Sequence, residues 1–182
     1  QTLAYRVNFG IAQPYGVSNG ILPYEKYFFA GGGTSIRAWQ ARRLGPGSYT
    51  PPTLENGLFD YRNEQPAEMI FETMFEYRRN LFGYFDMALF VDAGNSWNIG
   101  IENSRPGSDF RFDRFYKEIA IGTGIGLRMD FDFLIIRLDM ATKARDPAQP
   151  EGERWILDNL SFKRPLGQKG QTVFNFGIGY PF

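Results

Sequence analysis

The residues that most often carry out covalent chemistry in proteins are missing from this sequence. Histidine and cysteine are both absent from its 182 residues, which excludes zinc sites of the His/Cys type, thiol redox chemistry and catalytic arrangements of the Ser-His-Asp or Cys-His kind. Glu72 and Glu76 form the most suggestive acidic pair, but four residues along a strand separate them by about 13 Å. Glycosidase carboxylates lie about 5 to 9.5 Å apart. We therefore expect no enzymatic activity, no metal and no cofactor.

Glycine-rich segments could in principle bind phosphate groups. The segment 30–35, AGGGTS, lacks the Lys-Ser/Thr of a phosphate-binding loop, and no helical pattern follows it. Gly122, Gly124 and Gly126 occupy alternate positions, so they lie on one strand face and leave room for something packed close against it. Neither segment predicts a nucleotide site.

Charged residues recur at alternate positions of several segments and therefore share one face of the predicted strands. In a soluble sandwich they would form the solvated face, whereas in a membrane barrel they would point into the lumen. There they could pair with a basic residue brought in on a loop, and the long segment 14–65 offers Arg37, Arg42 and Arg43. Arginine suits such a place because its guanidinium presents a rigid fork of donors to carboxylates. The charges predicted on this inner face are Glu68, Glu72, Glu76, Arg78, Asp86, Asp92, Arg128, Asp130, Arg137 and Asp139.

Six segments with period-two alternation must position these residues. We expect strands over 2–11, 66–80, 85–94, 119–130, 134–141 and 173–182. The segment 66–80 would also place Glu68, Glu72 and Glu76 on one face of a helix. Its other parity is an almost unbroken apolar row, which favours a strand. The predicted fold class is all-β and antiparallel.

The lengths of the strands and of their connections favour a membrane barrel over a soluble sandwich. The longer segments have about 10 to 13 residues, close to the 9 to 11 of a tilted membrane strand and above the 5 to 6 typical of soluble proteins. Long connections over 14–65, 96–117 and 144–171 alternate with tight turns near 81–83 and 131–133, as in outer-membrane barrels.

The charge is balanced, with 20 basic and 20 acidic residues, which gives no general attraction for nucleic acid.

Six strands are too few to close a single-chain barrel, since the smallest have about eight. We therefore expect residues 1–182 to form the C-terminal part of one larger transmembrane β-barrel domain. Assembly of a barrel from several chains is an alternative. A soluble β-sandwich binding module, which the mean hydropathy of −0.35 would suit, is another.

Six motifs in one order resemble a known family. YFFAGGGTSIRAWQ, residues 27–40, resembles the inward-folded loop of the BamA/TamA superfamily of outer-membrane barrel assembly proteins, whose signature combines Gly-Gly, Ser and Val/Ile-Arg-Gly-Phe/Tyr. The similarity extends to FEYR around Glu76, to FVDAGNSW around Asp92 and to a closing strand that ends at Phe182. It also includes GTGIGLRMDF and IRLDMA. The loop motif would comprise Gly31, Gly32, Ser35, Ile36, Arg37, Ala38 and Trp39.

The resemblance has departures and implications for the rest of the protein. Ala38 and Trp39 stand where the family usually has Gly and Phe or Tyr, and RAWQARRLGPGSY is similar to the variant in TamA-like proteins of Bacteroidota, a surface-antigen type. The resemblance implies a 16-stranded barrel, to which this chain would contribute about six C-terminal strands. The repeated periplasmic POTRA domains of the family do not occur in these residues, so we expect them in the full-length protein.

The resemblance implies a protein of the bacterial outer membrane that takes part in the assembly, insertion or translocation of other proteins. A client strand would pair with an opened edge between the first and last strands. The implied partners are outer-membrane lipid, client outer-membrane proteins, and the remaining barrel strands and POTRA domains, with no nucleic acid. A passive pore or two-partner secretion channel of the same superfamily is the alternative. The closing strand would also carry the signal for assembly of this barrel itself, which would consist of Phe174, Phe176, Tyr180 and Phe182.

Arg37 is the residue we expect to connect the loop to the barrel wall. By strand parity, Glu76 and Asp92 point to the same side of neighbouring strands, which lie about 4.8 Å apart. One guanidinium with five donors can reach both carboxylates, and the resemblance implies the same contact. The alternative is an exposed loop arginine that tolerates replacement. Further lumen charges are expected at Arg128, Asp130, Arg137 and Asp139.

Overall fold

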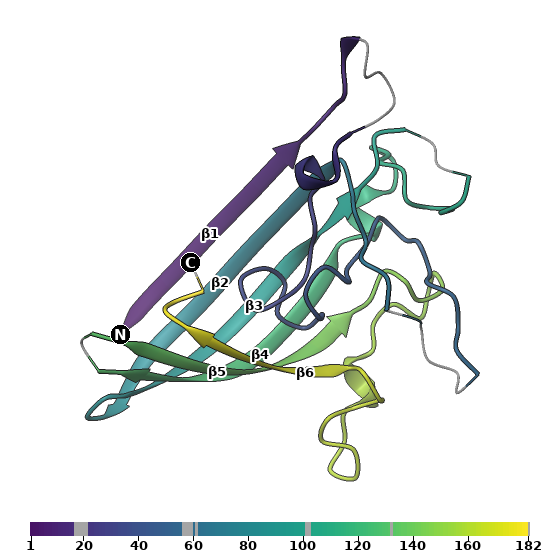
Figure 1. Ribbon diagram of the computed structural model, residues 1–182. Helices are drawn as coiled ribbons and strands as arrows, with labels where there is room; N and C mark the ends of the chain where they lie inside the picture. The colour runs from purple at the N-terminus through teal and green to yellow at the C-terminus, as the bar shows by residue number, and fades with distance from the viewer. Residues whose placement is uncertain (17–21, 56–59, 61, 101–102, 132, 182) are drawn as a thin grey trace.

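Six strands form one antiparallel sheet in which each strand pairs with the next along the chain (Figure 1). This is seen in a computed structural model that describes residues 1–16, 22–55, 60, 62–100, 103–131 and 133–181. The predicted all-β antiparallel fold is confirmed. The strands are β1 (Thr2–Ile11), β2 (Met69–Phe82), β3 (Phe85–Trp97), β4 (Ala120–Asp130), β5 (Ile135–Arg145) and β6 (Thr172–Ile178).

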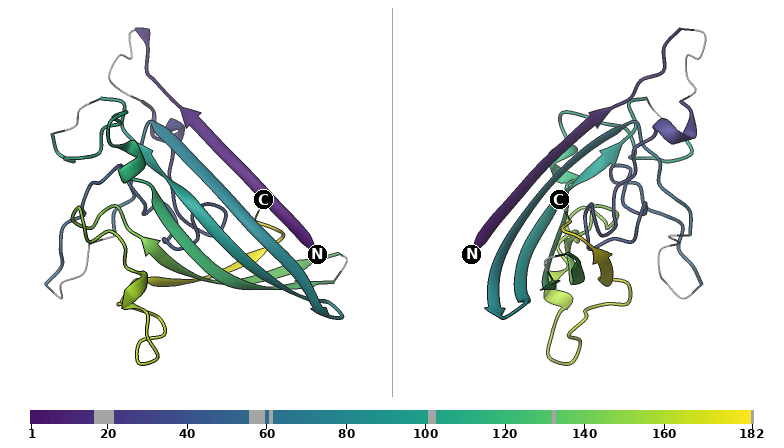
Figure 2. Two further views of the ribbon diagram at one scale, coloured as in Figure 1. Left: turned by 180° about the vertical axis from the view of Figure 1, so that it is seen from behind. Right: turned by 60° about the vertical axis from the view of Figure 1, so that its left-hand side comes forward.

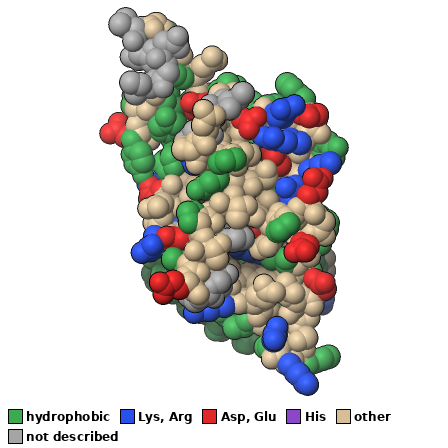
Figure 3. Space-filling model, turned by 90° about the vertical axis from the view of Figure 1, so that its right-hand side faces the viewer, with side chains coloured by type: hydrophobic (Ala, Val, Ile, Leu, Met, Phe, Trp, Pro, Cys, Tyr) green, Lys and Arg blue, Asp and Glu red, His purple; other side chains and the backbone are tan. Residues whose placement is uncertain are grey.

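The connections alternate in length, as the sequence predicts. Gly83 and Tyr84 join β2 to β3, and residues 131–134 join β4 to β5, whereas the other three connections are long. The long connections therefore gather at one end of the sheet and the tight turns at the other (Figure 1). Seen from the loop end, the surface carries charged side chains of both signs among apolar ones (Figure 3). Within the described ranges, no helix is long and apolar enough to cross a membrane.

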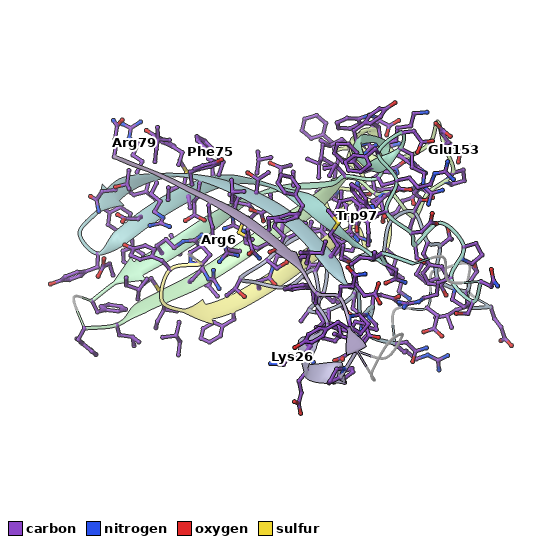
Figure 4. All side chains as sticks on the ribbon, turned by 90° about the horizontal axis from the view of Figure 1, so that it is seen from above. Arg6, Lys26, Phe75, Arg79, Trp97 and Glu153 are labelled. Atoms are coloured by element: carbon purple, nitrogen blue, oxygen red, sulfur yellow. The ribbon has the colours of Figure 1, made fainter. Side chains whose placement is uncertain are left out.

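The two faces of the curved sheet differ in chemistry. The outward side chains are apolar and exposed, as at Ile125, of which 51% is exposed. Figure 4 shows Phe75 on this convex side and Arg6 on the concave side. Charged residues of the opposite parity, such as Glu76 and Arg128, are buried. An apolar outer band and a polar interior are what a membrane barrel requires.

The buried apolar core lies between the connection from β1 to β2 and the concave face of the sheet (Figure 2). Gly122 of β4 lies directly beneath this connection, since a Cβ added to it would come within 2.6 Å of the Cβ of Ala38. The glycine on this strand face therefore makes room for the loop. The core residues are Ala30, Ile36, Ala38, Trp39 and Leu44 from the connection and Ile70, Phe90, Ala120 and Ala141 from β2 to β5.

Three strands extend past the C-terminal ends of the predicted segments. β2 continues to Phe82, β3 to Trp97 and β5 to Arg145. Asn95, Ser96 and Trp97 are all buried, because the loops cover the strand end on both faces and the period-two pattern is lost there. In β5 the register against β4 shifts between Ile121 and Gly122, which likewise breaks the alternation.

β6, by contrast, is shorter than predicted and does not reach residue 182. Gly179 adopts φ +84°, a left-handed conformation that favours glycine, and turns the chain after Ile178. The prediction that the closing strand includes Tyr180 is wrong. Its hydroxyl donates to Asp130 Oδ2 at 3.3 Å, and the Arg78 guanidinium lies 4.0 Å from the centre of its ring. Phe182 lies outside the described residues.

Candidate functional site

The loop motif forms a tight structure that presents one arginine to the sheet. Gly31 and Gly32 have φ angles of +97° and +107°, which a residue with a Cβ adopts only with strain. The Gly31 N–H donates to Ser35 Oγ at 2.8 Å, and the Ser35 hydroxyl contacts the Glu72 carboxylate on β2. The Gly32 N–H donates to the carbonyl of Trp39 at 3.0 Å. These bonds close the loop around Ile36, Arg37 and Ala38, all of which are completely buried.

Arg37 lies between the two predicted carboxylates. Its Nε and Nη2 donate to the two oxygens of Asp92 on β3 at 2.8 and 2.7 Å. Its Nη1 donates to Glu76 Oε2 on β2 at 2.5 Å, and its backbone N–H donates to Asp92 at 3.1 Å. The guanidinium carbon also lies 3.5 Å from the centre of the Phe90 ring. The structure thus brings together Arg37, Glu76 and Asp92, which we call the latch.

The latch belongs to a larger ion network on the concave face. Arg128 of β4 donates from Nη2 to Glu76 Oε2 at 3.0 Å and from Nη1 to Asp139 Oδ1 at 2.5 Å. Arg78 donates to the other oxygen of Glu76 at 2.6 Å. Asp139 Oδ2 lies 3.8 Å from Arg37 Nη1. Each of these side chains is at least nine-tenths buried, so the network links β2, β3, β4 and β5 to the loop.

The other predicted lumen charges have different positions. Arg137 lies beside Asp139, with Nε 3.7 Å from Oδ2. Asp130 accepts a hydrogen bond from the Tyr180 hydroxyl. On β6, the Asn175 side chain donates to the Arg37 carbonyl at 2.9 Å. Sequence reasoning missed Asn175, although its lumen parity between outward-facing phenylalanines is a signal that could have indicated it.

A second polar cluster, which the sequence did not predict, connects the long loops. Trp97 Nε1 donates to Glu118 Oε2 at 2.7 Å, Ser48 Oγ donates to Oε1 at 3.1 Å, and Arg114 Nε lies 2.9 Å from Oε1. Asn95 Nδ2 donates to the Glu118 carbonyl at 2.6 Å. Burial raises the pKa of the Glu118 carboxyl. This cluster fastens the connection between β3 and β4 to that between β1 and β2.

These features define a class of protein. A meander of long strands with an apolar outer face, tight turns at one end and a long connection folded onto its inner face forms the wall of an outer-membrane β-barrel. Within the described residues, the latch holds guanidinium and carboxylate groups that are paired with one another, an arrangement suited to fixing a loop in place.

The family model of the Omp85 superfamily domain matches residues 1–182, and the chain belongs to this superfamily. Omp85 proteins are outer-membrane β-barrels, and the superfamily in general serves protein assembly or translocation at that membrane, together with lipid and client proteins. The BamA/TamA resemblance is consistent with this membership. No curated protein matches the chain.

Proposed function

We propose that the protein inserts client β-strand proteins into the bacterial outer membrane and that the loop held by Arg37 controls this activity. The observation that carries the proposal is the completely buried latch, which fixes residues 30–44 against the concave face. A loop packed against the inner face takes up part of the space that a passive pore would use for conduction. The latch therefore favours an assembly factor over a pore or a two-partner secretion channel.

Client strands are expected to pair with a free sheet edge. β1 and β6 each pair with one other strand among the described residues, and an unpaired edge presents backbone N–H and C=O groups to an incoming strand. The loop contacts β6 through the hydrogen bond from Asn175 to the Arg37 carbonyl. Release of the latch would therefore act on both the lumen and the edge.

Within the superfamily, we assign the chain to the TamA-like branch of Bacteroidota. The support for this is the motif RAWQARRLGPGSY, in which Ala38 replaces the usual glycine. The Ala38 methyl is accommodated because the strand beneath it carries Gly122.

Two measurements on the full-length protein in liposomes test the proposed function. The first follows the folding of an unfolded client barrel, and the second records ion conductance across a planar bilayer. We expect the wild type to accelerate client folding and to conduct poorly, whereas Arg37→Ala should fold clients more slowly and conduct more. Arg79→Gln, at an exposed position of β2 near the tight turn (Figure 4), serves as the matched control. Steady conductance by the wild type without client folding would favour the pore.

A further inference from the structure

β6 has one edge that pairs with no other described strand, and its lumen face includes a polar residue and a glycine. Its Phe174, Phe176 and Ile178 side chains are exposed on the outer face, while Asn175 and Gly177 have the opposite parity. One edge of β6 pairs with β5, and the other pairs with no strand of the described chain. A strand added to this free edge would place every second side chain in the lumen, beside Asn175 and Gly177.

Arg137 of β5 extends across β6 toward that edge. Arg137 and Gly177 are direct partners in the register of the two strands. A Cβ built on Gly177 would lie 2.5 Å from Arg137 Nη2, 2.8 Å from Nε and 3.0 Å from Cζ. The guanidinium therefore occupies the place that a side chain at position 177 would take. Gly33 at the loop tip lies on it from the lumen side, with a built Cβ 3.4 Å from Nη2.

The guanidinium of Arg137 is not satisfied in this place. Arg137 is only 3% exposed, yet its Nε and Nη1 donate no hydrogen bond to any residue that the structure describes. Its ion pair with Asp139 is 3.7 Å long, and Asp139 makes its short contact of 2.5 Å with Arg128 instead. Arg37, Arg78 and Arg128 all have a carboxylate within 3.0 Å. Buried donors without an acceptor are costly, and a second carboxylate would relieve that cost.

We propose that Arg137 binds an acidic side chain of a client β-strand that pairs with the free edge of β6, at the position directly opposite Gly177. The inference rests on the proposed function and names the chemistry of the strand that it accepts. Cβ atoms of directly opposite residues lie about 4.5 to 5.5 Å apart. Because the guanidinium stands at the Cβ position of Gly177, with Nη2 nearest to it, the carboxylate of an Asp or Glu on the incoming strand can approach this guanidinium from the free edge.

The same geometry selects the register of the incoming strand as well as its charge. A shift by one residue turns every side chain of a strand to the other face. An acidic residue opposite Phe176 or Ile178 would then face lipid, where a charge is unfavourable. Only a strand whose acidic residue falls opposite Gly177 completes the coordination of Arg137.

Synthetic strand peptides and the full-length protein in detergent test the proposal. Two peptides differ only in a Glu or a Gln opposite Gly177, and each carries a cysteine opposite position 174, where the protein carries Phe174→Cys. The measured quantity is the peptide concentration that gives half-maximal disulfide crosslinking. Hydrogen bonds to charged groups are worth about 1.5 to 3 kcal/mol. The half-maximal concentration of the Glu peptide should therefore be lower than that of the Gln peptide by about tenfold or more. A third peptide with the Glu moved by one residue should lose this advantage.

Variants of the protein locate the preference. Arg137→Gln should bind both peptides equally, while Arg79→Gln, at an exposed position of the same sheet, should keep the tenfold preference. Gly177→Ala provides a second variant should Arg137→Gln fail to fold. Its methyl group would displace the guanidinium and should likewise abolish the preference.

Each other outcome overturns the proposal in a recognisable way. Equal crosslinking of the Glu and Gln peptides by the wild type, or a preference that persists in both variants, refutes the role of Arg137 and leaves strand pairing intact. Absence of any peptide crosslink refutes pairing at this edge and the proposed function with it. Crosslinks between two copies of the protein that no peptide reduces would identify a different occupant of the edge.

Discussion

Replacement of Arg37 by alanine should loosen the loop without disassembling the sheet. Among the described residues, the Asp92 carboxylate accepts hydrogen bonds from Arg37 alone, whereas Glu76 also accepts bonds from Arg78 and Arg128. Arg37→Ala therefore leaves one buried carboxylate stranded. Removal of one partner of a buried pair costs about 3 to 5 kcal/mol. Release of the loop would expose the buried side chains of Ile36, Trp39 and Leu44. Exposure costs about 1.5 to 3 kcal/mol for each of Ile36 and Leu44, and more for the larger Trp39.

Because the opposing packing is larger than the loss, the loop should stay docked but open more often. Amide hydrogen exchange in the full-length protein measures this opening directly. Protection of residues 36–44 should fall about 150- to 4000-fold in Arg37→Ala, since each 1.4 kcal/mol is a factor of ten. Amides in β3 and β4 should keep their protection. Arg37→Lys should recover part of the loss, because it restores the charge but not the fork of donors.

The unequal sharing of the two carboxylates gives a sharper test. Asp92→Asn added to Arg37→Ala should reduce protection little further or restore some of it, because the stranded charge is removed. Glu76→Gln added to Arg37→Ala should lower protection further, because Arg78 and Arg128 then each lose their ion pair with Glu76, although Arg128 keeps Asp139. Charge exchange by Arg37→Glu with Asp92→Arg should improve on either single change. If protection in Arg37→Ala stays within about threefold of the wild type, the latch does not hold the loop and the reasoning is wrong.

Other consequences can be measured independently. Ile125→Arg should destabilise the barrel by about 2 to 4 kcal/mol if it lies near the bilayer midplane, which urea titration in lipid vesicles would show. Gly122→Val should push Ala38 off β4 and increase proteolysis within residues 30–44. The raised pKa of Glu118 means that its carboxyl holds a proton more readily in the folded protein than in the unfolded chain. It therefore contributes loop stability that is complete below the unfolded pKa and is lost as pH rises through the folded pKa; Glu118→Gln should flatten this dependence in hydrogen exchange. The isolated 182-residue chain should oligomerise in detergent through its unpaired edges, and a monodisperse, heat-resistant monomer in light scattering would argue against a barrel fragment.

The strands and the inner face could be predicted from the sequence because one rule, alternation with period two, determines both. Parity alone places Glu76 and Asp92 on the same side of adjacent strands, where the structure has them. The ends of β3 and β5 could not be predicted in this way. There the loops bury both faces, and a register shift interrupts the pattern.

Which charged side chains pair with one another within the site could not be predicted from the sequence either. That Arg128 reaches Glu76 on a strand two positions away depends on the curvature of the sheet, which alternation does not encode. The contact between Phe90 and Arg37 could have been anticipated. Phe90 is an aromatic residue on the strand face that also carries Asp86, Ala88 and Asp92. The inward position of Tyr180 follows from the φ angle of Gly179, and a glycine in a sequence permits such a turn without requiring it.

The contacts of Arg37 span nearly the whole chain, and this has a consequence for the order of folding. Its loop contacts Asp92 on β3, Asp139 on β5 and Asn175 on β6, the last at a sequence separation of 138. Contacts between distant residues form late, since the entropy of closing a long loop must be overcome first. The arginine can therefore be fully coordinated only after the last of these strands has joined the sheet. We expect loop docking to be the final step of biogenesis, so that it marks a completed wall and leaves any chain with a missing strand open to proteolysis.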